Sequence, residues 1–382
     1  MGATLVVEHK TTSLEIGPGS PYWRRLLLDS QVSNYLVGAE SLGMRADGVL
    51  YDVVRKVQLR PQRATPPDER QYTQARSRAC PMCKKKGSPP APHDVELTED
   101  GEDGAPCTRI LRCEAGRLVT DPGGRLYANQ RAEDETPDEY RERVRAAIAE
   151  APDAYYQRGT IVRLEREVAD AARDMWELGR QIREAELAHR WPRNPDACDS
   201  YGSLCPYFDV CTGAARIDDV MRFRDAPSAN EELDEAPVDR RRLPILSTSA
   251  AKVYRSCPRK YYYAYVLRRR SVEDAAALRF GTLLHLGLER WWQTVDLDAA
   301  FAAMREQYTR LTAAPLDAVR AEELLRGYHA RWAGESYDVL AVEATFTAPL
   351  VNPDSGAPSK TWSLGGKIDA IAREIPRADA AE

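Results

Sequence analysis

The stretch Thr4-Leu-Val-Val-Glu-His-Lys10 places apolar residues before a charged end, a pattern that predicts a buried strand ending at a polar rim. Side chains alternate between the two faces of a strand, so Glu8 and Lys10 should point one way and His9 the other. The stretch Gly366-Lys-Ile-Asp369 closes a second predicted strand. Two such carboxylates side by side would offer the oxygen ligands that Mg²⁺ or Mn²⁺ prefers. Taken singly, each charge fits an ordinary strand end at the surface at least as well.

The composition is that of a folded globular protein. The chain has 382 residues, 43% hydrophobic and 30% charged, which suffices for one large core or two modest ones. It has no apolar run of about 18 residues and no basic-then-apolar start, so we expect a cytoplasmic protein with no membrane partner. The net charge of -5 argues against a uniformly basic surface. Two basic patches, residues 255–270 and 240–242, fit either phosphate contacts or a solvated face.

Periodicity and turn residues divide the chain into five parts of an α/β protein. Helices are expected over about residues 22–42, 136–148, 161–189, 247–267 and 281–292, with two more between 296 and 333. Strands are expected over about residues 4–10, 48–54, 337–347 and 362–372. The five parts are residues 1–60, a cysteine-rich insertion at 61–125, a helical region at 126–222, a flexible linker at 223–242, and residues 243–382.

The eight cysteines fall into two groups, and in a cytosolic chain of this size we expect metal ligands in preference to disulfides. One group combines Cys198, Cys205 and Cys211 with the distant Cys257. Four thiolates suit either tetrahedral zinc or a 4Fe-4S cluster, and the spacing alone does not decide between them. Cysteines that bind no metal and only pack in the core are the other alternative.

The second group of cysteines lies in the insertion, whose composition predicts no core of its own. Cys80-Pro-Met-Cys83 resembles half of a zinc ribbon, and Cys107 and Cys113 are the candidates for the other half. A bound metal would cross-link a segment that has no core to stabilise it, so we expect Zn²⁺ at these four cysteines.

Six motifs together resemble the RecB-like branch of the PD-(D/E)XK nucleases, which includes the AddB exonuclease domain and the CRISPR adaptation exonucleases. That branch carries, in order, a Tyr-x-x-Cys-Pro helix, Gly-Thr-x-x-His, a strand Glu, Gly-x-x-Asp, Glu-x-Lys and Gln-x-x-x-Tyr. The matching segments are Tyr254-Arg-Ser-Cys257-Pro258, Gly281-Thr-Leu-Leu-His285, Glu343, Gly366-Lys-Ile-Asp369, Glu8-His-Lys10 and Gln31-Val-Ser-Asn-Tyr35. The likeness covers most of the chain outside the cysteine-rich insertion.

This resemblance implies a fold and a set of catalytic roles. The fold would be a restriction-endonuclease-like core, in which helices flank a central mixed β-sheet. His285, Asp369 and Glu8 would hold Mg²⁺ or Mn²⁺, and Lys10 would be the catalytic lysine. A histidine that only packs in the core is the alternative for His285.

The remaining family positions would support the site. Gln31 and Tyr35 would line the side that faces DNA, and Glu343 would be a supporting acid. The cysteine trio with Cys257 resembles the iron-sulfur staple of the AddB-type exonucleases. The resemblance therefore favours a 4Fe-4S cluster over zinc at those four residues.

The order of the motifs departs from the family, because Gly-x-x-Asp normally precedes Glu-x-Lys by a short hairpin. Here Asp369 lies near one end of the chain and Glu8 near the other. A circular permutation explains this order, with residues 223–242 joining what are usually the ends. A tandem fragment, a dimer whose halves complete each other, and a rearranged sequence are the alternatives.

The function that these observations favour is a metal-dependent DNA exonuclease in recombination, repair or phage DNA processing. The chain has no Gly-x-x-x-x-Gly-Lys-Ser/Thr motif, so unwinding of duplex DNA would need a helicase or recombinase partner. Tyrosines at 261–263 and 265 fit either stacking on single-stranded bases or packing within a helix. A catalytically silent DNA-binding module and a zinc-dependent regulatory protein are the competing functions.

Overall fold

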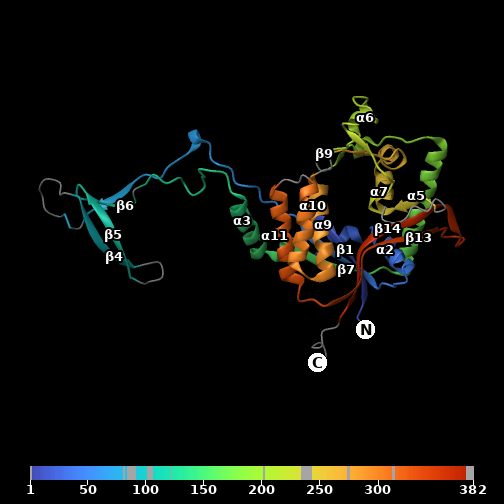
Figure 1. Cartoon of the computed structure of the whole chain (residues 1–382), viewed down its shortest axis with the longest axis horizontal. Coiled ribbons are helices and arrows are strands. Elements are labelled where there is room, and N and C mark those ends of the chain that lie inside the picture. The colour runs from blue at the N-terminus through green and yellow to red at the C-terminus, as the bar shows by residue number, and fades with distance from the viewer. Residues whose placement is uncertain are drawn as a thin grey trace. The chain divides into compact units, whose positions relative to one another are not determined.

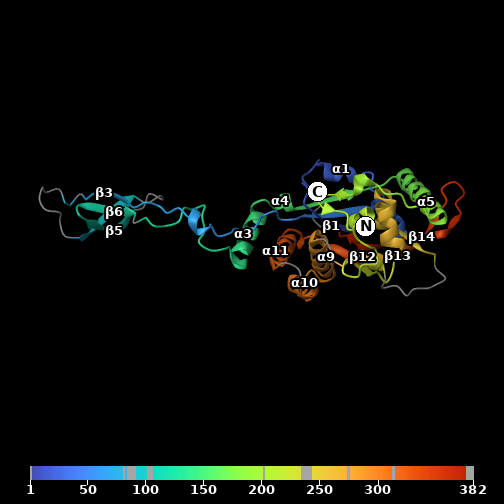
Figure 2. The ribbon, with the colours of Figure 1, turned by 90° about the horizontal axis from the view of Figure 1, so that it is seen from above.

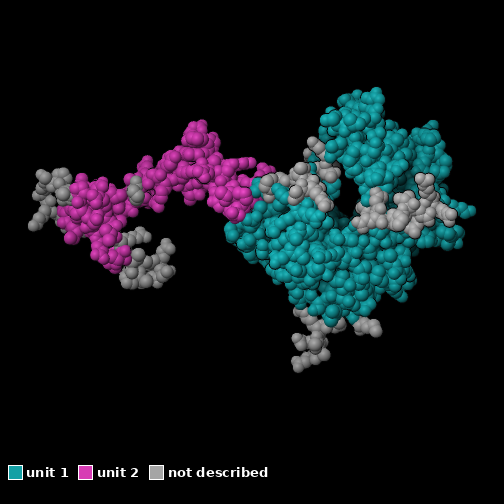
Figure 3. Space-filling view, in the orientation of Figure 1, with its two compact units in different colours: residues 1–58, 141–382 teal, residues 59–140 magenta. Residues whose placement is uncertain are grey.

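The computed structural model in Figures 1 and 2 divides into two compact units, which Figure 3 distinguishes by colour. The first unit comprises Met1–Gln58 and Arg141–Glu382, and the second comprises Leu59–Tyr140. The structure describes residues 2–80, 82–83, 92–100, 106–121, 123–200, 203–233, 243–272, 276–311 and 315–375. Within these ranges no helix is both long and apolar enough to span a bilayer.

A mixed β-sheet of six strands forms the centre of the first unit. The strands are β1 (Thr4–Thr12), β2 (Gly48–Arg55), β7 (Tyr156–Ile161), β11 (Ile245–Ser247), β13 (Tyr337–Val351) and β14 (Pro358–Glu374). Their order is β11-β14-β1-β2-β7, and β13 also pairs with β14. β1 runs parallel to β2 and antiparallel to β14, while β13 and β14 form a long antiparallel hairpin. β1 therefore lies in the middle of the sheet, between segments far apart in the sequence.

Helices cover both faces of this sheet. The helices described in the first unit, besides α3 (Pro137–Glu150), are α1 (Pro21–Leu26), α2 (Ser30–Ser41), α4 (Pro152–Tyr155), α5 (Glu165–Ala188), α6 (Phe208–Thr212), α7 (Thr248–Ser256), α8 (Pro258–Tyr261), α9 (Ala276–Thr294), α10 (Leu297–Leu311) and α11 (Pro315–Trp332). α2 packs on β13 and β14, whereas α9 contacts β1 and packs side by side with α10 and α11 (Figures 1 and 2). The arrangement confirms the expected α/β class, with a central mixed sheet flanked by helices.

The core between α2 and the sheet is tightly packed. Val6 of β1, Tyr35 of α2, and Phe346 of β13 are all buried in one apolar cluster. Gly38 of α2 is needed for this approach, because a Cβ atom at that position would lie 2.6 Å from the Phe346 ring. α2 is thereby held close to the strands that carry the candidate site.

Three expected helices differ in the structure. The helix expected over residues 247–267 is broken at Cys257, whose backbone is extended, into α7, α8 and a π-helix. The helix expected over residues 22–42 is interrupted, because the Asp29 side chain accepts a hydrogen bond from the Gln31 backbone N–H at 2.9 Å and caps α2. The helix expected from residue 161 begins only at Glu165, since the preceding residues form β7 and pair with β2. Pairing of β7 with a neighbouring strand, which periodicity within one segment does not reveal, therefore determines where this last helix begins.

The segment expected to be a flexible linker is partly ordered, so that prediction was wrong for its first half. β10 (Phe223–Asp225) pairs with β12 (Arg269–Ser271), and a short 3-10 helix covers Glu231–Leu233. The buried Asn230 accepts a hydrogen bond from the Ser247 hydroxyl at 2.7 Å. Residues 234–242, with the basic patch at 240–242, lie outside the described residues.

The second unit is built around a small antiparallel sheet. Its strands are β3 (Arg76–Ala79), β4 (His93–Asp100), β5 (Pro106–Glu114) and β6 (Arg117–Asp121), in the order β3-β6-β5-β4. Its apolar cluster has Cys80, Val95, Cys113 and Leu118 as its buried members. The expectation of an insertion without any core is thus corrected to one with a very small core.

The remaining elements are short, apart from α3. α3 (Pro137–Glu150) crosses the boundary between the units and begins with a capping box, in which Thr136 and Glu139 each bond the other's backbone N–H. The others are the 3-10 helices Pro67–Glu69 and Pro195–Ala197, the strands β8 (Asp199–Ser200) and β9 (Ser203–Leu204), and the π-helix Tyr262–Val266.

Candidate active site

Two strands from distant parts of the sequence bring Glu8 and Asp369 together. β1 and β14 pair from Thr4 opposite Arg373 to Val7 opposite Ala370. Directly beyond this pairing, the backbone N–H of His9 donates a hydrogen bond to Asp369 Oδ2 at 2.7 Å. Both carboxylates therefore lie within neighbouring strands of one chain, at the point where the pairing between β1 and β14 stops.

Glu8 is the centre of a side-chain network on the face that α2 covers. Lys10, two residues along the same strand, forms an ion pair with Glu8 Oε1. Gln31 Nε2 donates to the same oxygen at 2.8 Å and to the Tyr35 hydroxyl at 2.7 Å. The cap at Asp29 places Gln31 in the first turn of α2, from which its side chain reaches β1.

Burial dominates the electrostatics of these groups. It raises the pKa of both Glu8 and Asp369, against the lowering effect of the nearby Lys10 charge. Burial opposes the charge of Lys10 too, but attraction to the two carboxylates outweighs it and raises the pKa of Lys10. Glu8 Oε2 is buried and has no hydrogen-bond partner among the described residues. Such an oxygen is a ready ligand for a cation, because leaving it unpaired costs free energy.

His285 approaches the site from α9, on the opposite face of the sheet from α2. Its ring lies edge-on to the ring of His9, with 6.3 Å between the centroids. Burial, together with the charges of His9 and Lys10, lowers the pKa of His285 to about 4, so its imidazole is neutral at neutral pH. In the described ranges, the one set of His, Cys, Asp and Glu side chains with all ligand atoms within 4.8 Å of one another lies in the second unit. The ligand atoms of His285, Glu8 and Asp369 are therefore not all within 4.8 Å of one another.

Behind His9 lies a buried ionic network that the sequence did not predict. His9 Nδ1 lies 3.1 Å from Asp52 Oδ2. Arg158 of β7 contacts both Asp52 oxygens, at 3.1 and 3.2 Å, and the Tyr328 hydroxyl donates to Asp52 as well. Burial alone would raise the pKa of Asp52, but Arg158 and His9 outweigh it and hold that pKa well below its usual range.

This network fixes the residue whose backbone binds Asp369, so Asp52 and Arg158 are positioning residues. A signal for Asp52 was available, since it is the one charged residue inside the apolar run Gly48–Val54. Arg158 was missed because the strand that carries it, β7, was not expected.

Glu343 lies across the β13–β14 hairpin from Asp369, between the pairs Val342–Ala370 and Ala344–Ile368. Its carboxylate forms an ion pair with Lys367 and raises the pKa of Asp369. Its φ of 52° is uncommon for a residue with a side chain. Glu343 is therefore held beside the site, paired with a lysine.

A cleft of about 380 Å³ opens beside Lys10. Its basic lining residues are Lys10, Arg25, Lys252 and Arg255. Of the basic patch at 255–270, Arg255 thus faces the cleft, whereas Arg259 and Arg270 donate to backbone carbonyl groups. The tyrosines of that segment pack against one another and against Trp191, which favours packing over base stacking.

The four cysteines of the first unit gather at one place. Cys198, Cys205, Cys211 and Cys257 line a cavity of about 400 Å³ and are all free thiols. They come from the segment after α5 and from the start of α8. They are not among the described side chains whose ligand atoms all lie within 4.8 Å of one another.

The four cysteines predicted in the second unit do not converge. Cys107 lies opposite Glu99 in the β4–β5 ladder, six residues from Cys113. A strand rises about 3.3 Å per residue, so roughly 20 Å separates these two positions. His93, which pairs directly with Cys113, lies beside Cys80 and Cys83 instead. His93 was not among the ligands predicted from the sequence.

Residues 245–379 match the family model described as PD-(D/E)XK nuclease superfamily. They form a domain of that superfamily, which indicates a metal-dependent nuclease acting on DNA, and the mixed sheet is consistent with a restriction-endonuclease-like core. The matched residues contain His285, Glu343 and Asp369 but exclude β1. No curated protein and no solved structure was found to match the chain.

Proposed function

We propose that the first unit is a Mg²⁺- or Mn²⁺-dependent DNA exonuclease whose site lies where β1 meets β14. The observation that carries this proposal is the contact between the strand of Glu8 and Lys10 and the strand of Asp369. The residues that match the nuclease superfamily supply the aspartate, and β1, outside them, supplies the Glu-x-Lys. The two parts complete one site within a single chain.

The residues of this site fit a divalent cation. Glu8 through its unpaired Oε2 and Asp369 would hold it, and the neutral imidazole of His285 would complete the ligand set by moving toward them. When bound, such an ion activates the attacking water and neutralises charge on the phosphate. Lys10 is protonated at neutral pH and lies beside Glu8, so it adds positive charge where negative charge develops on the phosphate.

The cleft beside Lys10 suits a DNA backbone. Arg25, Lys252 and Arg255 put positive charge along its walls, and phosphate contacts of this kind supply most non-specific affinity for DNA. Gln31 links the cleft to the site, because it bonds both Lys252, at 3.2 Å, and Glu8. We expect Lys252→Met to weaken DNA binding and to reduce its salt dependence by about one counterion.

The unusual motif order is consistent with a circular permutation within one chain. The Glu374 backbone N–H donates to the Ala3 carbonyl at 2.9 Å, so the outer ends of β14 and β1 lie side by side. A swapped dimer is unnecessary to complete the site. A gene in which the segment containing β1 follows the segment containing β14 should still encode an active nuclease.

The cysteine cavity of the first unit is proposed to hold a 4Fe-4S cluster, bound by the four thiolates. Cys257, at the start of α8, would tie the trio to the nuclease domain. Iron and brown colour in anaerobically purified protein, both lost in Cys257→Ser, would support the cluster. Stoichiometric zinc at these cysteines with no iron would reject it.

The nuclease proposal is tested by Asp369→Ala and Glu8→Ala. Each should abolish Mg²⁺-dependent cleavage while DNA binding persists, because the carboxylates act on the metal and not on the DNA backbone. Asp338→Ala, which removes an exposed aspartate from β13, is the matched control. Retained turnover in the Asp369 variant would overturn the site assignment. Unmodified protein that binds DNA but cleaves nothing with Mg²⁺ or Mn²⁺ would point to a silent binding module.

The exonuclease mode is tested by comparing linear and circular single-stranded DNA of the same sequence. An exonuclease degrades only the linear form, and cutting of the circle would show endonuclease activity instead. Duplex with blunt ends, added with and without a helicase, shows whether unwinding by a partner is required.

A further inference from the structure

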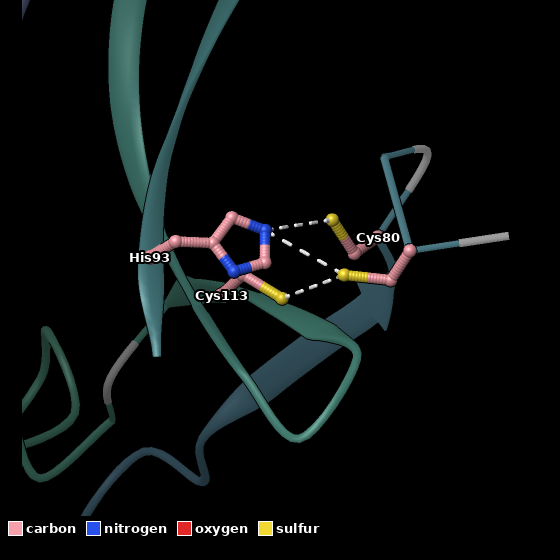
Figure 4. Close-up of side chains that lie close together, drawn as sticks. Cys80, His93 and Cys113 are labelled. Atoms are coloured by element: carbon pink, nitrogen blue, oxygen red, sulfur yellow. Dashed lines mark hydrogen bonds between the residues drawn. The ribbon is translucent and has the colours of Figure 1, made fainter. Parts of the chain in front are cut away.

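We propose that the second unit binds one Zn²⁺ ion through Cys80, Cys83, His93 and Cys113. This site is independent of the proposed nuclease function, because all four residues belong to the smaller unit. Figure 4 shows the His93 ring and the sulfur atoms turned toward one common point. Their four ligand atoms all lie within 4.8 Å of one another.

The distances between the ligand atoms are those of a tetrahedral zinc site. The Sγ atoms of Cys83 and Cys113 are 3.6 Å apart. Nε2 of His93 lies 3.5 Å from Cys83 Sγ and 3.9 Å from Cys80 Sγ. Zinc bonds of about 2.3 Å to sulfur and 2.0–2.1 Å to nitrogen, at tetrahedral angles, require about 3.8 Å between sulfurs and about 3.6 Å between sulfur and nitrogen. One ion at the common point would therefore bond all four atoms with little movement.

A disulfide, an iron-sulfur cluster and a plain core of thiols each fit these four residues less well than zinc does. A disulfide requires about 2.05 Å between sulfurs, and these cysteines are free. An iron-sulfur cluster would hold the ligands farther apart, around a core of several atoms. Thiols that only fill a core would not all need to face one imidazole nitrogen. Three thiolates with one imidazole are a ligand set that suits zinc.

The backbone holds each ligand in place before any ion binds. Cys80 follows β3, and its N–H donates to the carbonyl of Gly116 at 2.9 Å in the β5–β6 turn. Cys83 follows in a tight turn, where its N–H bonds the Cys80 carbonyl. His93 and Cys113 face each other across the β4–β5 ladder. Three separate segments thus converge on one point, and an ion there would cross-link β3, β4 and β5.

The small core explains why this unit needs a cross-link. Two of its buried members, Cys80 and Cys113, are ligands themselves, and the other buried members among the described residues are Val95 and Leu118. An apolar set of this size contributes little to folding. Structural zinc supplies folding free energy directly, since the unfolded chain lacks the assembled site.

The test is metal analysis of the full chain, purified with zinc and compared among single variants. Cys113→Ser and His93→Ala should each lose one equivalent of Zn²⁺ relative to the unmodified chain. Cys107→Ser is the matched control, because it removes a cysteine from the same strand as Cys113 but should keep the zinc. His93→Cys should also keep it, since a fourth thiolate replaces the imidazole. Because the cysteines at 198–257 are unchanged throughout, any metal bound there cancels in the comparison.

Two further measurements guard against a variant that merely misfolds. Co²⁺ added to the unmodified chain after zinc removal should give the visible absorption of a tetrahedral thiolate site, and His93→Cys should shift that spectrum. Limited proteolysis should cut residues 59–140 much faster in Cys113→Ser than in Cys107→Ser. Equal zinc content in all variants, or loss of zinc in Cys107→Ser but not in His93→Ala, would overturn the proposal.

Discussion

The two units assemble their candidate metal sites by opposite routes. In the first unit, Glu8 and Asp369 come from strands far apart in the sequence and meet because both strands lie inside a six-stranded sheet. In the second unit, the ligands lie within residues 80–113, on a four-stranded sheet with a small apolar cluster. A large core can keep buried charges in place by packing and ion pairs. A small core leaves that task to the metal.

Among the substitutions that compare the two units, Lys10→Met should have the largest effect. The lysine adds charge at the reacting phosphate, so its loss should lower the rate of Mg²⁺-dependent cleavage by about 100-fold or more. Lys360→Met, on β14 in the same unit and outside the cleft, should leave the rate unchanged. The measurement is single-turnover cleavage of linear DNA. An unchanged rate in Lys10→Met would contradict the claim that the site where β1 meets β14 catalyses cleavage.

Arg158→Met should lower the free energy of unfolding of the first unit by about 3–5 kcal/mol, because it leaves Asp52 charged and buried without its main partner. The contrast is Arg63→Met in the second unit, where the ion pair with Asp134 is exposed and its loss should leave the unfolding midpoint unchanged. Urea denaturation followed by fluorescence reports both. Equal effects of the two substitutions would show that burial does not distinguish the ion pairs of the two units.

Gly38→Ala should destabilise the first unit by about 1–2 kcal/mol. Alanine favours a helix over glycine by roughly 0.5–1 kcal/mol, but the added methyl group collides with the Phe346 ring, and overpacking costs about 1–3 kcal/mol. Gly334→Ala, where nothing lies within 4 Å of the new atom, should not destabilise the unit. If Gly38→Ala proved neutral in urea denaturation, α2 would not be held as tightly on the sheet as the structure has it.

The smallest effect should come from Ser247→Ala, which removes the cap of α7 and the hydrogen bond to Asn230. We expect a loss of about 1 kcal/mol in unfolding free energy. Asn230→Ala and the double variant complete a cycle, and a positive coupling energy would show that residues 223–233 are anchored to the core. If the two single substitutions had additive effects on the free energy of unfolding, residues 223–233 would behave as a free linker.

Local features were predictable from the sequence, whereas features set by neighbouring strands were not. The capping box at Thr136 and the cap at Ser247 depend on residues three positions apart, and both are present. β7 was missed, because its strand conformation comes from pairing with β2. Cys107 was chosen over His93 because spacing along the chain says nothing about which residue faces Cys113 across a ladder. Asp52 could be recognised in the sequence as a charged residue within an apolar strand. Its partner Arg158 could not be inferred, because β7, the strand that carries it, was not predicted.

The sequence by itself determined the α/β class, the Glu-x-Lys and Gly-x-x-Asp motifs, and the two groups of cysteines. Each of these follows from residue types at short spacings, which fix local conformation and alternation of faces. The tertiary structure decided that β1 lies beside β14 in one chain, that Asp52 and Arg158 pair behind His9, and that His93 joins Cys80, Cys83 and Cys113. Those juxtapositions depend on which strands hydrogen-bond to each other. That choice depends on the burial of the whole core, which no single stretch of sequence contains.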